Sequence, residues 1–294
     1  MSSLQAKRVL ITGGAQGIGF EMAKKFAEHG AELVIADIDD EKLAEAKSKL
    51  EELHARVWCF RVDVTNPTSI ASLRAQVAAE AGPVDILVNN AGVVFGGPFT
   101  EIPLDDHLKT YEVNVLGLVA MTYAFLPDLI ERPEAHLVHI ASASGFIGLP
   151  YGASYASSKW AVIGFGESIR AELKLMGHEH VHTTIVCPSY IGTGMFEGAA
   201  APKATHILEP DEIATKIVHA VERNKVHVLE PFMVKLTPLL RDLLPTPLYD
   251  RLSHLFGADT SMAHWRGRGD DDKHAEGSSP EPKTKSSSRP ETKS

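Results

Sequence analysis

Three features are scarce in this sequence, and each scarcity excludes a class of protein. Only 2 cysteines occur among 294 residues, Cys59 and Cys187, so we expect buried free thiols rather than a disulfide framework. A formal net charge of −9 gives no basic surface for nucleic acid. Neither a run of 18 apolar residues nor an N-terminal apolar signal core is present, which argues against a membrane-spanning helix and predicts a cytoplasmic protein.

Strand-like and helix-like segments alternate over the first 230 residues. Runs rich in β-branched residues predict strands at 7–12, 32–37, 57–64, 85–90, 136–142, 181–188 and 225–231. Apolar periodicity predicts helices at 17–29, 40–53, 67–81, 104–131, 154–177 and 210–223. This alternation predicts an α/β fold, a Rossmann-type doubly wound parallel sheet of about seven strands flanked by helices.

The chain divides into three parts on this reading. Residues 1–230 form a single catalytic domain, and residues 231–266 form an amphipathic helical extension. Residues 267–294 contain almost no apolar side chain, and this composition predicts a disordered tail.

A glycine-rich turn joins the first predicted strand to the first helix. Glycines in such a turn let the backbone approach a pyrophosphate, and the positive N-terminal end of the helix then faces that charge. The residues expected to hold the cofactor here are Gly13, Gln16, Gly17, Ile18 and Gly19.

An acidic residue ends the second predicted strand and bears on the choice of cofactor. The Asp37 carboxylate can accept hydrogen bonds from both adenosine ribose hydroxyls, and it repels a 2′-phosphate. Gln16, Ile38 and Asp39 supply no positive charge for such a phosphate, so the sequence favours NAD over NADP. Ends of the third and fourth strands meet the same crevice, and they add Asp63, Val64, Asn90, Ala91 and Gly92 to the expected cofactor contacts.

Tyr155 and Lys159 lie four residues apart at the start of a predicted helix, so they share a face. A phenol titrates near pH 10 when unperturbed, and a nearby ammonium or a cationic nicotinamide ring would lower that pKa. Ser142 ends the fifth strand, where it can hydrogen-bond a substrate oxygen, and Asn114 is a polar residue within an apolar helix. These four residues are the predicted catalytic set.

Taken together, the motifs resemble the standard-length branch of the short-chain dehydrogenase/reductase superfamily over residues 5 to about 230. The residues that carry the resemblance are T-G-x-x-x-G-x-G, N-N-A-G, Asn114, Ser142 and Y-x-x-x-K, in this order. The resemblance implies that Tyr155 is the general acid/base, that Lys159 lowers its pKa and binds the nicotinamide ribose, that Ser142 orients the substrate oxygen, and that Asn114 carries a water of the proton relay. It also implies cofactor contacts by Pro188, Ile191 and Thr193.

The implied reaction is hydride transfer between a secondary alcohol and a ketone or aldehyde. Apolar residues expected to line the substrate pocket are Phe146, Leu149, Met195 and Phe196, together with Ser142 and Tyr155. No Arg or Lys stands between Ser142 and Tyr155 to bind a carboxylate or phosphate, which indicates a steroid-, retinoid- or lipid-like substrate. The closing S-M-A-H-W-R-G-R-G resembles bacterial relatives of the retinol and 17β-hydroxysteroid dehydrogenases.

Two alternative functions stay open. An NADP-dependent 3-oxoacyl or carbonyl reductase would be expected to carry basic residues for its cofactor, against which Asp37 argues. A non-catalytic dinucleotide sensor is disfavoured because Asn114, Ser142, Tyr155 and Lys159 are all present.

The histidine-rich run at 178–182 does not predict a metal site, because donors on one short segment rarely suffice, so no metal is expected. Leucines of 231–256 predict one or two short amphipathic helices broken at Pro238, Pro245 and Pro247. In the resembled family, residues 191–209 form the substrate loop. The stretch 231–256 is expected to pack on this loop or on a second subunit of a homodimer or homotetramer, with peripheral membrane contact as the alternative.

Overall fold

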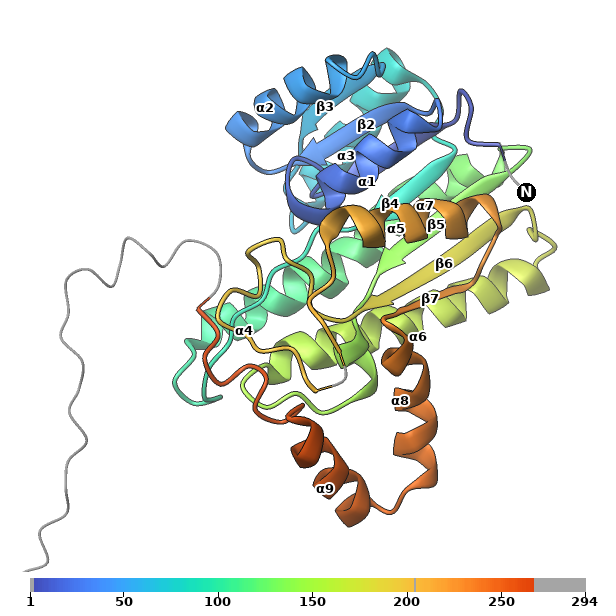
Figure 1. Cartoon of the computed structure of the whole chain (residues 1–294). Helices are drawn as coiled ribbons and strands as arrows, with labels where there is room; N and C mark the ends of the chain where they lie inside the picture. The colour runs from blue at the N-terminus through green and yellow to red at the C-terminus, as the bar shows by residue number, and fades with distance from the viewer. Residues whose placement is uncertain (1–2, 204, 267–294) are drawn as a thin grey trace, which may run out of the picture.

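The computed structural model describes residues 3–203 and 205–266, and the predicted disordered tail lies outside these residues (Figure 1). One sheet of seven parallel strands runs through the domain in the order β3-β2-β1-β4-β5-β6-β7. The strands are β1 (Arg8–Thr12), β2 (Glu32–Asp37), β3 (Val57–Arg61), β4 (Ile86–Asn89), β5 (Ala135–Ile140), β6 (Val181–Pro188) and β7 (His227–Glu230). The predicted sheet is confirmed, and its order reverses between β1 and β4, where ligands of such sheets bind.

Helices cover both faces of this sheet, as the alternation predicts. They are α1 (Gly17–Glu28), α2 (Asp40–Glu51), α3 (Pro67–Gln76), α4 (Leu104–Tyr111), α5 (Leu118–Ile130), α6 (Ala153–Leu175), α7 (Pro210–Glu222), α8 (Phe232–Leu243) and α9 (Thr246–Phe256). Two π-helical segments, η1 (Val77–Ala81) and η2 (Glu112–Gly117), and a short 3-10 helix, η3 (Ala143–Phe146), complete the set.

The period-2 alternation of the strands divides the core into two apolar layers. Val9 and Ile11 of β1 pack with α1, α2 and α7, whereas Leu10 between them packs with α3, α5 and α6 on the opposite face. Both faces are buried, which is why the strands read as continuous apolar runs rather than alternating ones.

One predicted strand ends earlier than expected. The sequence predicts a third strand reaching Val64, but β3 ends at Arg61. Val62 still donates its N–H to the Asp37 carbonyl at 2.7 Å, whereas the Asp63 N–H turns to the Ser69 hydroxyl at 3.0 Å. The chain therefore leaves the sheet just before Asp63, and Asp63 and Val64 lie in the loop that follows.

The predicted long helix from 104 to 131 is a continuous stretch of α4, η2 and α5. By length and composition alone, Leu104–Ile130 is apolar enough to cross a membrane. In this fold it instead forms part of one layer of the domain, with α5 packed on α3, β4 and β5 and with α4 and η2 packed on α6. A core helix of a globular domain passes the same test of composition.

The extension forms two helices, although the prolines act differently from the prediction. Pro238 lies inside α8, and Pro247 lies in the first turn of α9, where a missing N–H costs nothing. Only Pro245 stands at a break between the helices. The α8–α9 pair projects from the body of the domain in Figure 1, and the chain then returns toward the substrate loop.

Candidate active site

The glycine-rich turn after β1 has the shape that close approach of a cofactor requires. Gly13 and Gly17 have φ values of +60° and +58°, which favour glycine. A Cβ on Gly19 would lie 2.2 Å from the Gly13 carbonyl oxygen, so the turn would open if Gly19 carried a side chain. Among the described residues, no side chain caps the start of α1, where Gln16 is the N-cap residue. Its first backbone N–H groups can therefore meet an anion.

Side chains from β1 and from the loop after β4 hold this turn in place. The Asn90 amide donates to the carbonyls of Thr12 and Gly13 at 2.8 and 2.9 Å. In return the Thr12 hydroxyl accepts the backbone N–H groups of Asn90 and Ala91 at 3.0 and 3.1 Å. Thr12 is a supporting residue that the sequence prediction missed, because nothing local shows that a strand-end threonine bonds a loop almost 80 residues away.

Asp37 is buried beside the turn, at the carboxyl end of β2. Its carboxylate accepts the N–H of Ala15 at 3.1 Å and that of Ile38 at 2.8 Å. Arg61 stands in register with it on β3, but this exposed guanidinium forms an ion pair with Asp40 at 3.3 Å. The Asp37 carboxylate therefore lies beside the glycine-rich turn, and the Arg61 guanidinium is paired with Asp40.

The remaining predicted cofactor contacts lie at the ends of the other strands. Asp63 accepts hydrogen bonds from the N–H and hydroxyl of Thr65, and these hold its pKa below the usual value. Val64 is buried against Gly117 of η2. Pro188 ends β6, and Ile191 and Thr193 follow it, with Ile191 bridged to Leu208. All of these positions open on the same edge of the sheet.

The four predicted catalytic residues are buried and converge from two helices and one strand end. Tyr155 and Lys159 lie one turn apart on α6, with the ammonium 5.7 Å from the phenol ring centroid. Asn114 lies in the π-helical segment η2, and Ser142 caps η3 by accepting the Ser144 N–H at 3.2 Å. A Cβ on Gly92 would lie 3.2 Å from the Asn114 amide oxygen and 3.6 Å from the Lys159 ammonium, so these groups surround one point.

Asn114 fixes the loop after β4 to the catalytic helix. Its amide oxygen accepts the Val93 N–H at 2.8 Å, and its amide nitrogen donates to the Val93 carbonyl and to the Ser158 hydroxyl, each at 3.0 Å. Lys159 donates to the Ile140 carbonyl at 2.8 Å, which ties α6 to the end of β5. Hydrogen bonds to the backbone of neighbouring elements therefore hold Asn114 and Lys159 in place.

Burial shifts the pKa values of both Tyr155 and Lys159. The sequence predicts that Lys159 lowers the pKa of Tyr155, but burial raises the pKa of Tyr155 well above its usual value, and the hydrogen bond with Ser142 opposes the rise. Burial also lowers the pKa of Lys159 to about 8. Desolvation by burial is the largest cause of both shifts, and the Lys159 ammonium donates its hydrogen bond to the Ile140 carbonyl.

An apolar cluster covers one side of Tyr155. Phe196 meets the Tyr155 ring edge-on at 5.5 Å between centroids, and Leu149 and Met195 belong to the same cluster. Phe146 does not: it packs with Leu118, Val162 and the neighbours of Cys187 in a separate cluster. This second cluster includes Cys187 itself, and the place of Phe146 in the pocket wall stays a prediction.

The end of the extension closes this cluster from outside. Met262 is buried within it, and Trp265 donates its indole N–H to the Met195 carbonyl at 3.0 Å. Tyr190 donates its hydroxyl to Ser261 at 2.7 Å. The sequence predicts packing on the substrate loop for 231–256. Most of this packing is made by the segment after α9, whereas α9 buries none of its residues and contributes the Phe256 carbonyl, which accepts the Lys203 N–H at 2.8 Å.

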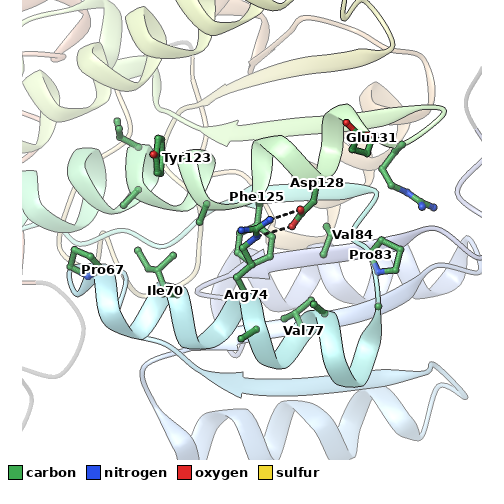
Figure 2. A pocket seen from close by; sticks show the side chains of 18 of the residues that line it. Pro67, Ile70, Arg74, Val77, Pro83, Val84, Tyr123, Phe125, Asp128 and Glu131 are labelled. Atoms are coloured by element: carbon green, nitrogen blue, oxygen red, sulfur yellow. Dashed lines mark hydrogen bonds and ion pairs between the residues drawn. The ribbon is translucent and has the colours of Figure 1, made fainter.

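An open groove with a volume of about 910 Å³ lies apart from this site, between α3 and α5 (Figure 2). Arg74 and Asp128 form an ion pair across it at 2.5 Å, and Tyr123 and Ile70 stand at its side. None of the predicted site residues lines this groove. The active site therefore lies where the four catalytic side chains converge, and not in the groove.

Comparison with known proteins agrees with this geometry. Residues 7–204 match the family described as short chain dehydrogenase. The chain belongs to the short-chain dehydrogenase/reductase family. It is therefore an oxidoreductase that acts on alcohol and carbonyl groups, and its Rossmann-type sheet is the fold of the family's solved structures.

Several short-chain dehydrogenases resemble it along most of their length. Human epidermal retinol dehydrogenase 2 is 37% identical over 240 residues, which is 81% of this chain and 78% of the relative. Human estradiol 17-beta-dehydrogenase 11 is 35% identical over 243 residues, 83% of this chain and 81% of the relative.

Two solved structures of the family show the cofactor class. A Burkholderia phymatum short chain dehydrogenase in complex with NAD has a TM-score of 0.75 and 28% identity, covering 82% of this chain and 95% of that one. An alcohol dehydrogenase from Thermococcus sibiricus complexed with 5-hydroxy-NADP has a TM-score of 0.67 and 28% identity, covering 76% and 94%. The cofactor class is thus a nicotinamide dinucleotide.

Proposed function

We propose that this protein interconverts a lipophilic secondary alcohol and its ketone or aldehyde, with NAD as the cofactor. The observation that carries the proposal is the setting of Tyr155, whose polar side meets Ser142 and whose ring lies in an apolar cluster with Leu149, Phe196 and Met262. Relatives named as retinol and estradiol dehydrogenases support a lipophilic substrate. A 3-oxoacyl reductase that uses NADP is less well supported, because the Asp37 carboxylate beside the glycine-rich turn would repel a 2′-phosphate.

The residues present fit a nicotinamide dinucleotide. Gly19 lets the Gly13–Gly19 turn stay tight, because a Cβ there would clash with the Gly13 carbonyl. The start of α1 has no side-chain cap, so its N–H groups can bind the pyrophosphate. Asp37 has acceptor oxygens for the ribose, and Lys159 and the loop from Asn90 to Gly92 border the nicotinamide side. When bound, the cofactor supplies a carbon that accepts or returns a hydride.

In this mechanism the chain's own groups handle the proton. Ser142 orients the substrate oxygen beside Tyr155. The Tyr155 oxygen takes the proton of the substrate hydroxyl as a hydride leaves the carbon that bears this hydroxyl. In reduction, Tyr155 returns that proton to the carbonyl oxygen. The apolar cluster excludes water from the site, and general acid–base help of this kind accelerates the reaction about 10²–10⁴-fold.

A panel of substrates tests the proposal. Steroid, retinoid, aryl and aliphatic alcohols are each offered with NAD and with NADP, and NADH or NADPH formation is followed by absorbance. Activity confined to lipophilic alcohols with NAD is the expected result. Preference for NADP would contradict the role of Asp37, and activity only on small polar alcohols would contradict the apolar pocket.

Ser142→Ala is expected to move the pH profile of alcohol oxidation. Oxidation needs the Tyr155 oxygen without its proton, and Ser142 is the group that lowers this pKa against the effect of burial. Without it the pKa rises further, so the rising limb of kcat against pH moves to higher pH, and turnover at neutral pH falls. Ser144→Ala removes a nearby buried hydroxyl and serves as the control. An unshifted limb in Ser142→Ala would contradict the assignment.

We further propose that the α8–α9 hairpin rests on a membrane surface. Exposed leucines project from it, with 56% of Leu239, 71% of Leu243 and 63% of Leu255 accessible, and the basic side chains of Lys235 and Arg251 stand nearby in sequence. An amphipathic surface of this kind binds lipid through apolar burial and attraction to anionic headgroups.

Replacing Leu239, Leu243 and Leu255 with serine is expected to abolish co-sedimentation with anionic phospholipid vesicles. The changes leave the fold intact because these side chains are exposed. Leu175→Ser, on α6, removes a leucine that is 88% exposed elsewhere and is the matched control. If the triple variant still binds vesicles like the unchanged protein, the hairpin is not the lipid contact.

Self-association is proposed through the outer face of α4 and α5. Leu104, Leu108, Leu116 and Tyr123 are all half or more exposed on the stretch from α4 to α5. Such a face is buried in a symmetric homodimer or homotetramer.

A further inference from the structure

Two helices that cover the same face of the sheet bring metal-binding side chains together away from the active site. His29 follows the end of α1, and His219 and Glu222 lie near the end of α7. One donor atom from each residue lies within 4.8 Å of the others. The catalytic mechanism uses none of these residues, and the 12 residues of α1 place them about 18 Å from its cofactor-facing start.

The imidazole of His29 is already oriented as a ligand. Its Nδ1 lies 2.9 Å from the Lys25 carbonyl oxygen. A carbonyl can only accept, so Nδ1 carries the proton, and the Nε2 lone pair is left available. That Nε2 lies 3.9 Å from a carboxylate oxygen of Glu222. Histidines that bind metals have this arrangement, in which the second nitrogen donates to a carbonyl or carboxylate.

The other two donors come from one face of α7. His219 and Glu222 are three residues apart, so they are neighbours on the helix surface. The His219 ring lies 5.8 Å from the His29 ring, edge to face. Donors on a tetrahedral zinc ion with bonds of about 2.0–2.1 Å lie roughly 3.4 Å apart. His219 is exposed, so rotation of its side chain can close the distance without moving a packed group.

We propose that His29, His219 and Glu222 form a binding site for a divalent transition-metal ion, zinc by its donor set, that ties α1 to α7. Two imidazoles and a carboxylate with a water as fourth ligand are a set that zinc accepts. The sequence predicts no metal, because it offers only the run at 178–182, whose His180 instead contacts the Ile130 carbonyl. The ion joins residues almost 200 positions apart, so it stabilises the folded chain by binding it in preference to the unfolded one.

Zinc titration of the full chain without a histidine tag tests the site. Calorimetry is expected to show one zinc ion per chain, and zinc at about 100 times its dissociation constant is expected to raise the melting temperature by roughly 5 °C, reversed by EDTA. His29→Ala and His219→Ala each reduce the affinity at least tenfold, whereas the control His178→Ala, in the histidine-rich run, retains it. Co²⁺ replaces zinc as a spectroscopic probe, and its visible absorption reports four-coordinate binding.

The proposal is overturned if no zinc binds at a tenfold molar excess. It is equally overturned if the double variant His29→Ala/His219→Ala binds zinc as the unchanged protein does, or if His178→Ala abolishes the binding. Each outcome is read from binding and melting, so failure of the proposed dehydrogenase activity leaves it unaffected.

Discussion

Replacing Tyr155 with phenylalanine is expected to reduce alcohol oxidation by at least 10²–10⁴-fold while leaving NADH binding almost unchanged. The substitution removes only the hydroxyl oxygen that takes the substrate proton. The ring keeps its place between Leu149, Ala156 and Phe196, because these contacts are apolar and the residue is buried. The measurement is kcat for a lipophilic alcohol beside NADH affinity by fluorescence titration.

Two controls make this result specific to Tyr155. Tyr190→Phe removes a second hydroxyl of the same cluster, one that bonds Ser261 rather than substrate, and it should keep most of the turnover. The melting temperature of each variant shows that the fold is intact. Normal turnover by Tyr155→Phe would remove the residue from the mechanism and with it the proposed reaction.

Asp37→Asn is expected to lower kcat/KM with NAD by about 10–100-fold and to shift the preference toward NADP. A hydrogen bond to a charged group is worth about 1.5–3 kcal/mol, and asparagine keeps the shape while it removes the charge. It also removes the repulsion of a 2′-phosphate. The measurement is kcat/KM with each cofactor at saturating alcohol.

Asp39→Asn is the matched control for this change. Asp39 lies two residues away, and its side chain caps α2 by accepting the Lys42 N–H at 3.0 Å. Its backbone N–H, which the substitution keeps, donates to the Asp37 carboxylate at 3.3 Å. It should leave the cofactor preference unchanged. If Asp37→Asn uses NAD as well as the unchanged protein, Asp37 does not determine the choice of cofactor.

Most of the fold follows from local features of the sequence. Strands β2 and β6 have the predicted ends, and the helix boundaries agree within a few residues, because apolar runs and Gly30 or Gly82-Pro83 stops act locally. The limit of β3 was missed because the hydrogen bond from Asp63 to Ser69 depends on where the next helix lies. The role of Pro238 was missed for a similar reason: α8 packs on β7 and η3, and that packing tolerates a proline within the helix.

The candidate site also has a part that the sequence predicts and a part that only the structure shows. The residues with motif spacing, Tyr155 and Lys159 among them, lie together as predicted because strand ends converge on one edge. The closing contacts of Ser261, Met262 and Trp265 with the substrate loop were not visible, since they join segments about 70 residues apart. The raised pKa of Tyr155 was also not predictable from the sequence, because the burial that raises it depends on the whole fold.

The most direct test of the central claim is kcat/KM for a series of linear secondary alcohols of increasing chain length with NAD. Each CH₂ buried in an apolar pocket contributes about 0.8 kcal/mol, so kcat/KM is expected to rise about fourfold per added carbon until the cluster around Phe196 and Met262 is filled. A series that stays flat, or that falls as carbons are added, would contradict a lipophilic substrate at Tyr155.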